Sequence, residues 1–211
     1  MTAPILPKTG LLALALAGIA AATPALAHHP MGGMIPATFT QGLLSGLGHP
    51  VIGLDHLAAL VGVGLVASRF ARGLTLPAFW MLAMAAGVGL HLANFDLPYT
   101  EALVALSVVA IGLAATIRTT LPYALIALLF AAGGAVHGYA LGESIIGAET
   151  SPLAAYLIGL VAVQTALTTG IALAARFVMK GSLAAPAPQL RLAGLAVAVT
   201  GAAFLTLPAF A

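Results

Sequence analysis

Histidine and acidic side chains supply the chemistry of this sequence, because the chain has no cysteine and few charged residues. Two short motifs hold most of them, His49-Pro-Val-Ile-Gly-Leu-Asp55-His56 and His137-Gly-Tyr-Ala-Leu-Gly-Glu143. Imidazoles and carboxylates without thiols suit divalent metals of intermediate softness, such as Ni²⁺, Co²⁺ and Zn²⁺. The candidate metal ligands are therefore His49, Asp55, His56, His137 and Glu143.

A second set of candidate ligands surrounds the two motifs. It comprises two neighbouring histidines near the start, a later histidine and two acidic residues that follow it: His28, His29, His91, Asp96 and Glu101. A flexible tail accounts for His28 and His29 as well as an ion-capturing segment does. Glu101 is placed to open a helix, where a carboxylate complements the helix dipole, so a structural role competes with a ligand role there.

The composition places these residues in a membrane. Hydrophobic residues make up 62% of the 211 residues and charged residues 6%, whereas soluble domains carry about a quarter charged residues. Soluble enzymes and nucleic-acid binders are excluded on this ground, and the seven basic residues do not cluster as a phosphate-binding patch needs. The sequence has no GxxxxGK[ST] loop, so we expect no ATP hydrolysis by the chain itself.

The first 27 residues have the form of a secretory signal peptide. Lys8 precedes an apolar run from Leu11 to Ala22, and the segment ends in Ala25-Leu26-Ala27. This run is short for a membrane span, and its small closing residues suit a cleavage site. We expect residues 1–27 to be removed and residues 28–211 to form one transmembrane metal-transport domain, with an uncleaved first helix as the alternative.

The rest of the chain predicts an all-α integral membrane protein, a bundle of six transmembrane helices. Each span is an apolar stretch near the length of about 20 residues that a bilayer needs. The expected spans are Val51–Ser68, Leu74–Ala93, Pro98–Ile117, Leu121–Tyr139, Pro152–Val178 and Leu190–Leu207. A shorter segment, Pro36–Leu47, is expected to be a re-entrant or interfacial half-helix that joins the first span through a break at His49-Pro50.

The basic residues give this bundle a direction. With the mature N-terminus outside, the span ends that carry Arg69, Arg118 and Arg176 all face the cytoplasm, as the positive-inside rule requires. The acidic residues Asp96 and Glu143 then fall at outer ends. We expect a multi-pass protein of a bacterial inner membrane, with both mature termini outside.

The two histidine motifs resemble the signatures of the HupE/UreJ family. The first is His49-x5-Asp55-His56 followed by Leu-Ala-Ala-Leu-Val-Gly-Val-Gly, and the second is His137-Gly-x-Ala-x-Gly-Glu143. Two further pairs continue the resemblance in the same order, Glu101 with Ser107 and Tyr156 with Gly159. The resemblance covers nearly the whole mature chain.

This resemblance implies a nickel or cobalt permease tied to hydrogenase or urease maturation, with a cleaved signal peptide and six spans. It assigns metal recognition to His49, Asp55, His56, His137 and Glu143. We expect entry of Ni²⁺, with Co²⁺ or Zn²⁺ as alternative cargo, across the bilayer toward cytoplasmic nickel chaperones. We expect no prosthetic group, no enzyme activity, no nucleic-acid partner and no use of ATP.

Two other functions fit the same residues. A zinc-dependent membrane hydrolase would use the metal to activate water, with Ser107 or Asp55 as a catalytic residue and a lipid as substrate. A metal-binding sensor or accessory protein would bind the ion without transporting it. A permease needs a polar path that continues to the cytoplasmic side, and this sequence offers Gln164, threonines and small residues for it.

Overall fold

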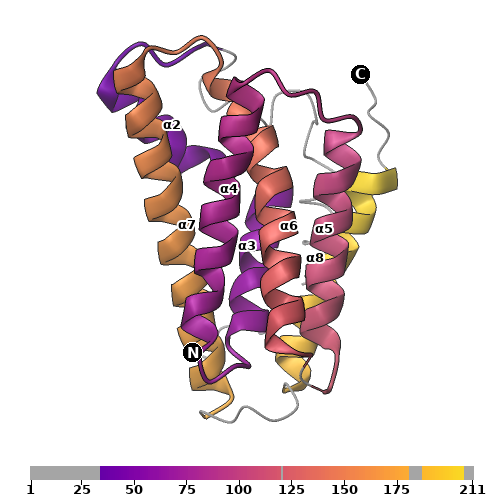
Figure 1. Cartoon of the computed structure of the whole chain (residues 1–211). Coiled ribbons are helices and arrows are strands. Elements are labelled where there is room, and N and C mark those ends of the chain that lie inside the picture. Colours follow the sequence, from indigo (N-terminus) through magenta and orange to yellow (C-terminus); the bar gives the residue numbers. More distant parts are fainter. Residues whose placement is uncertain (1–33, 120, 181–186, 207–211) are drawn as a thin grey trace, which may run out of the picture.

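The computed structural model describes residues 34–119, 121–180 and 187–206, which form an all-helical bundle (Figure 1). In chain order the α-helices are α2 (Phe39–Ile52), α3 (Leu54–Ala67), α4 (Leu76–Leu92), α5 (Thr100–Thr116), α6 (Tyr123–Gly142), α7 (Thr150–Val178) and α8 (Pro188–Thr206). Two short 3₁₀ helices, η2 (Gly73–Thr75) and η3 (Glu143–Ile145), adjoin the start of α4 and the end of α6. The expected signal peptide, together with His28 and His29, lies outside the described residues.

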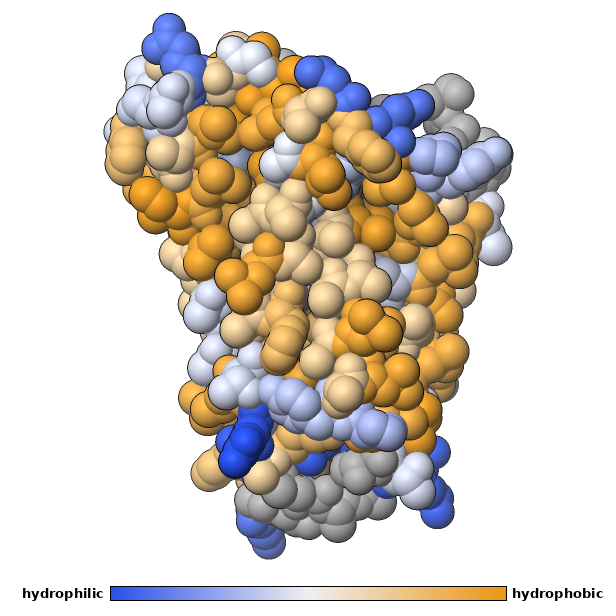
Figure 2. Space-filling view, in the orientation of Figure 1, coloured by the Kyte–Doolittle hydropathy of each residue, from blue (hydrophilic) through white to orange (hydrophobic). Residues whose placement is uncertain are grey.

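The described helices agree with a multi-pass membrane protein. Four stretches are long and apolar enough to cross a bilayer: Gly73–Leu92, Tyr123–Ile145, Thr150–Val178 and Pro188–Thr206. α2 and α3 pass the same test together, as a pair bent by 77°, and give a fifth crossing if they are one span. α5 is apolar and 17 residues long. Figure 2 shows an apolar belt between two ends that carry hydrophilic residues.

Close packing of helix pairs places the elements of the bundle. α4 packs along α6, α5 along α8 and α2 along α7. In the first pair, a Cβ on Gly138 of α6 would overlap the main-chain oxygen of Met84 in α4. A glycine at this position therefore permits the close approach that membrane helices often make through small residues. The same pairing brings Trp80 of α4 against His137 of α6.

α3 is the central helix, in contact with α2, α5, α7 and α8, and every residue from Gly62 to Arg69 is buried. The break between α2 and α3 lies at Gly53, whose backbone is extended (φ −70°, ψ 107°). Its N–H still closes the last turn of α2 on the His49 oxygen at 3.0 Å. α2 and α3 are therefore bent against each other at a residue within the first histidine motif.

The position of this break differs from the expected one. The sequence predicts a break at His49-Pro50, but α2 continues through Pro50 to Ile52 and is longer than the half-helix expected over Pro36–Leu47. A proline removes one helical hydrogen bond, and membrane helices tolerate that loss where the neighbouring structure satisfies the freed group. The extended residue is instead Gly53, three positions later.

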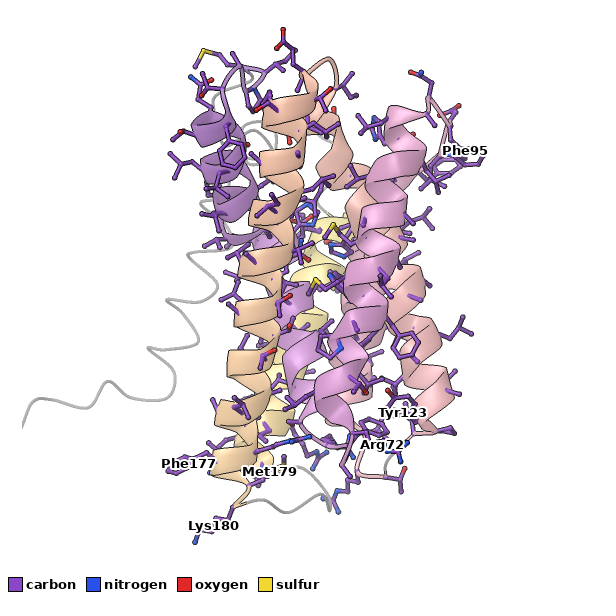
Figure 3. The ribbon with its side chains drawn as sticks, turned by 60° about the vertical axis from the view of Figure 1, so that its left-hand side comes forward. Arg72, Phe95, Tyr123, Phe177, Met179 and Lys180 are labelled. Atoms are coloured by element: carbon purple, nitrogen blue, oxygen red, sulfur yellow. The ribbon has the colours of Figure 1, made fainter. Side chains whose placement is uncertain are left out.

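The two ends of the bundle carry opposite charges. Figure 3 shows Arg72 and Lys180 at one end, which we call the basic end, and Phe95 at the other. α3, α5 and α7 finish at the basic end, where α4, α6 and α8 begin. All six basic residues of the described ranges lie in the first or last turn of these helices or just beyond their ends: Arg69, Arg72, Arg118, Arg176, Lys180 and Arg191. The opposite end, which we call the acidic end, carries Asp96, Glu101, Glu143 and Glu149, all exposed.

Candidate metal site

Three buried histidines from three helices meet beside the break, and we call them the histidine cluster. His49 lies near the end of α2, His56 in the first turn of α3 and His137 on α6, and each is at most 2% exposed. The Nδ1 atoms of His56 and His137 are 2.7 Å apart. The rings of His49 and His56 meet edge to face, with centroids 5.7 Å apart. The bend thus brings both ends of the first motif onto the histidine of the second.

Asp55 is buried at the N-terminus of α3, next to the cluster. Its Oδ1 accepts a hydrogen bond from the main-chain N–H of His56 at 2.8 Å. The partial positive charge of a helix N-terminus stabilises a carboxylate at this position. A Cβ on Gly53 would lie 2.9 Å from Cδ2 of His56 and 3.2 Å from Oδ1 of Asp55. The absence of a side chain at Gly53 therefore leaves room for both groups.

Hydroxyl groups surround the cluster. Nδ1 of His49 lies 2.9 Å from the hydroxyl of Tyr156 on α7 and 3.1 Å from Oγ of Ser144 in η3. Nε2 of His137 lies 2.9 Å from Oγ of Ser107 on α5. These contacts tie the imidazoles to three more elements of the bundle.

Trp80 and Gln164 form a chain of contacts that leads away from the histidine cluster. The Trp80 ring packs on His137 with centroids 4.8 Å apart, and its indole N–H donates to Oε1 of Gln164 at 2.8 Å. Nε2 of Gln164 is buried and has no hydrogen-bond partner among the described residues. Thr168 is also buried, one helical turn further along α7. Because α7 runs from the acidic to the basic end, these two residues continue from the cluster toward the basic end.

Glu143 lies apart from the histidine cluster, although the second motif ends with it. Gly142 keeps a helical backbone (φ −64°, ψ −26°), so α6 runs directly into η3 without a turn back toward His137. The Glu143 side chain is exposed, whereas Ser144 is buried and reaches His49. The structure therefore places a hydroxyl in the cluster where the sequence indicates a carboxylate.

The second set of candidates also lies away from the cluster. His91 is half-buried at the end of α4, where its Nδ1 is 2.7 Å from the main-chain oxygen of Tyr139. Asp96 and Glu101 are exposed at the acidic end. Over residues 34–119, 121–180 and 187–206, no three or more His, Asp or Glu side chains are arranged to hold one metal ion.

Sequence reasoning identified the three histidines and Asp55, and it missed Ser144 and Trp80. Ser144 directly follows the second motif, and Trp80 is the single tryptophan of the chain, so the sequence offered a signal for each. Tyr156 is indicated by the sequence only through the family resemblance, and Ser107 also as a catalytic candidate. Their common role as hydrogen-bond partners of imidazoles depends on the packing of α5 and α7 against α2 and α3.

Comparison with known proteins gives a consistent result. The family model described as HupE / UreJ protein matches residues 14–204. A curated relative, Protein HupE of Rhizobium leguminosarum bv. viciae, is 33% identical over 190 residues, which cover 88% of this chain and 93% of the relative. No solved structure matches the chain.

HupE/UreJ proteins are associated with nickel and cobalt transport in the accessory systems of hydrogenase and urease, and they are accessory transporters rather than enzymes. The hydrolase alternative is therefore set aside, even though Ser107 lies within hydrogen-bond distance of His137. The match spans nearly all the described helices, including both histidine motifs. The chain belongs to the HupE / UreJ family.

Proposed function

We propose that this protein is a permease that carries Ni²⁺ across a bacterial inner membrane for hydrogenase or urease maturation, with Co²⁺ or Zn²⁺ as alternative cargo. The histidine cluster at the bend between α2 and α3 carries this proposal. Transporters often place their substrate sites at discontinuous helices, because the unwound backbone and its neighbours offer polar groups inside the bilayer. The proposal counts α2 with α3 as one broken span and α5 as a full span, giving six.

In this proposal the cluster replaces part of the hydration shell of the ion. His49, His56 and His137 supply imidazoles, and the buried Asp55 supplies negative charge. Two imidazole nitrogens bound to one ion at about 2.1 Å lie about 3 Å apart in neighbouring positions. The 2.7 Å between Nδ1 of His56 and Nδ1 of His137 is close to that separation, so an ion fits after a small movement of the rings and the departure of the proton that joins these two nitrogens. Buried ionisable groups at membrane depth commonly mark such ion paths.

Charge indicates the direction of transport. The exposed carboxylates at the acidic end, Glu143 among them, raise the local concentration of cations at the entry. The basic end faces the cytoplasm under the positive-inside rule, and the mature termini lie outside. The membrane potential then supplies about 4–5 kcal/mol for a divalent ion at 100 mV. Cytoplasmic nickel chaperones are the proposed recipients.

The N-terminal segment completes the proposal. Residues 1–27 are a cleaved signal peptide, and residues 28–211 are the transport domain. Cleavage leaves His28 and His29 at the outer surface, where their imidazoles make a first contact with the ion before it reaches the cluster.

Uptake of ⁶³Ni²⁺ into proteoliposomes with an inside-negative potential tests the proposed function. Wild-type protein is expected to show saturable uptake, and His56→Ala is expected to lose it. His91→Ala is the matched control, because this half-buried histidine contacts a main-chain oxygen outside the cluster. The proposal fails if wild-type vesicles take up no more than protein-free vesicles, or if His56→Ala transports normally. Tight nickel binding without uptake would instead identify a non-transporting accessory protein.

A further inference from the structure

We propose that the hydroxyl groups of Ser107, Ser144 and Tyr156 fix the tautomers of His49 and His137, and so decide which imidazole nitrogens bind the metal. This inference rests on the proposed function, because it assigns the ligand atoms of the same cluster. We call these three side chains the hydroxyl frame. They are positioning residues, which act on the ion only through the histidines.

The hydroxyl of Ser107 acts as an acceptor toward His137. A serine hydroxyl has one proton, and Oγ of Ser107 donates it to the main-chain oxygen of Val104 at 2.7 Å. The contact of 2.9 Å between Oγ of Ser107 and Nε2 of His137 is then a bond that the imidazole donates. In a neutral imidazole, one nitrogen carries the proton and the other a lone pair. The lone pair of His137 is thus on Nδ1, the atom that lies 2.7 Å from Nδ1 of His56.

Tyr156 and Ser144 act in the same way on His49. The Tyr156 hydroxyl donates to the main-chain oxygen of Leu141 at 2.7 Å. The Ser144 hydroxyl is directed at that same oxygen, at 3.2 Å, and at the Tyr156 oxygen, at 3.0 Å. Both oxygens therefore receive a hydrogen bond from Nδ1 of His49, at 2.9 and 3.1 Å. This arrangement puts the proton of His49 on Nδ1 and its lone pair on Nε2.

The arrangement suits a metal site in a bilayer. Histidines that bind metals usually donate their other N–H to a carboxylate, a carbonyl or water, which fixes the ring and its tautomer. Here hydroxyls that are themselves bonded to main-chain oxygens take that place. A neutral acceptor fixes the ring without adding another charge at membrane depth, where charges are costly. The hydroxyl frame thus leaves a different nitrogen with the lone pair in each histidine, Nε2 in His49 and Nδ1 in His137.

NMR of protein with ¹⁵N-labelled histidine, in lipid nanodiscs without metal, reads the tautomers directly. The expected result is a proton on Nε2 of His137 and on Nδ1 of His49. Ser107→Ala is expected to abolish the tautomer preference of His137 and to weaken Ni²⁺ binding about 10- to 100-fold, the usual effect of losing a partner of a ligand histidine. Ser107→Thr keeps the hydroxyl and is expected to retain both properties. Tyr156→Phe is expected to affect His49 in the same manner.

Ser45→Ala is the matched control, because Ser45 is a buried serine on α2, 3% exposed, four residues before His49. It should change neither the tautomers nor the affinity. The opposite tautomers in the wild type, or unchanged tautomers in Ser107→Ala, would overturn the hydroxyl frame. An equal loss of affinity in Ser107→Ala and Ser45→Ala would also overturn it, since packing alone would then explain the loss. If wild-type protein neither binds nor transports Ni²⁺, the proposed function fails, whereas the NMR spectra still report on the frame.

Discussion

The basic end and the histidine cluster use nitrogen side chains in different ways. At the basic end, Arg69 donates to the main-chain oxygens of Ala114, Arg118 and Thr119 at 3.4, 3.2 and 3.1 Å. Arg176 likewise donates to main-chain oxygens after α3, and Arg191 donates to one in the last turn of α5. In the cluster, the imidazoles bond to one another and to hydroxyls.

The difference separates groups that stabilise the fold from groups that we propose bind an ion. The last carbonyls of a helix have no partner within it, and cations near a helix C-terminus satisfy them and complement the dipole. The arginines therefore stabilise the ends of α3 and α5. The histidines of the cluster contact one another and neighbouring hydroxyls, and in the proposed function an ion replaces the contacts between the rings. Substitutions at the two places should thus affect different measurements.

The largest expected effect is on stability, from Arg69→Ala. Arg69 is 5% exposed, and its loss leaves three main-chain oxygens without a charged donor. We expect the free energy of unfolding to fall by about 2–4 kcal/mol, as for the loss of charged hydrogen bonds in a buried setting. The Ni²⁺ affinity should not change, because the bend at Gly53 is untouched. Unfolding in detergent and a nickel titration measure the two effects.

The control for Arg69→Ala is Arg72→Ala, since Arg72 is exposed at the same end of the bundle. Its effect on the free energy of unfolding should stay within about 0.5 kcal/mol. Equal destabilisation by both substitutions would remove the special role of Arg69. A large loss of nickel affinity in folded Arg69→Ala protein would show that the basic end also affects metal binding, which contradicts the separation of the two roles.

The next effect is on nickel affinity, from Gly53→Ala. An alanine tolerates the backbone angles of Gly53, so the added Cβ acts only through its contacts with His56 and Asp55. We expect about a tenfold loss of Ni²⁺ affinity, the lower range for disturbed supports of metal ligands, with a loss of about 1 kcal/mol in stability. Isothermal titration in detergent and thermal unfolding measure the two.

Gly89→Ala is the matched control for Gly53→Ala. A Cβ at Gly89 of α4 has no neighbour within 4 Å, so an alanine there should leave nickel affinity unchanged. Its higher helix propensity should stabilise the protein by about 0.5–1 kcal/mol. Unchanged affinity in Gly53→Ala would show that the space left by Gly53 is not needed to position the His56 ring.

A smaller effect is expected from Gln164→Leu, on the rate of transport and not on the affinity for Ni²⁺. Gln164 lies between the cluster and the basic end, and Trp80 holds its Oε1. We expect uptake to slow about fivefold, the equivalent of about 1 kcal/mol for one neutral hydrogen bond, with equilibrium nickel binding unchanged. Thr165→Val, at an exposed neighbouring position on α7, is the control. Normal uptake in Gln164→Leu would place the inward path elsewhere.

The smallest effect is expected from the exposed carboxylates, for example Glu143→Gln. Because Glu143 lies outside the cluster, we expect about a twofold decrease in the rate of capture at low ionic strength. The decrease should vanish at high salt, which screens exposed charges. Uptake at subsaturating Ni²⁺ in two salt concentrations measures it. A large loss of affinity that persists in high salt would instead make Glu143 a ligand.

Much of the fold was predictable from the pattern of apolar residues. The expected span Leu74–Ala93 is found as η2 and α4, over Gly73–Leu92, and Pro152–Val178 corresponds to α7. The break was predicted near its true place but not at Gly53, because proline signals a helix end in water more reliably than in a bilayer. The space beside Gly53 is shaped by its near neighbours in the sequence, His49, Asp55 and His56.

The candidate site was predictable in its histidines and not in its geometry. His49, His56 and His137 stand out because imidazoles are rare among apolar residues. That Glu143 faces outward and Ser144 inward follows from η3 continuing α6, which the glycine at 142 does not reveal. The role of Tyr156 depends on the packing of α2 against α7, more than 100 residues apart in the sequence.

Nickel K-edge X-ray absorption of Ni²⁺-loaded protein in lipid nanodiscs tests the central claim, that the histidine cluster binds the ion, most directly. With the ion in the cluster, we expect two or three imidazole nitrogens at about 2.1 Å from the metal. We also expect this imidazole signal to disappear in the His56→Ala, His137→Ala variant and to persist in His91→Ala. A shell of oxygen ligands alone in the wild type, or the same imidazole signal in the double variant, would contradict the account.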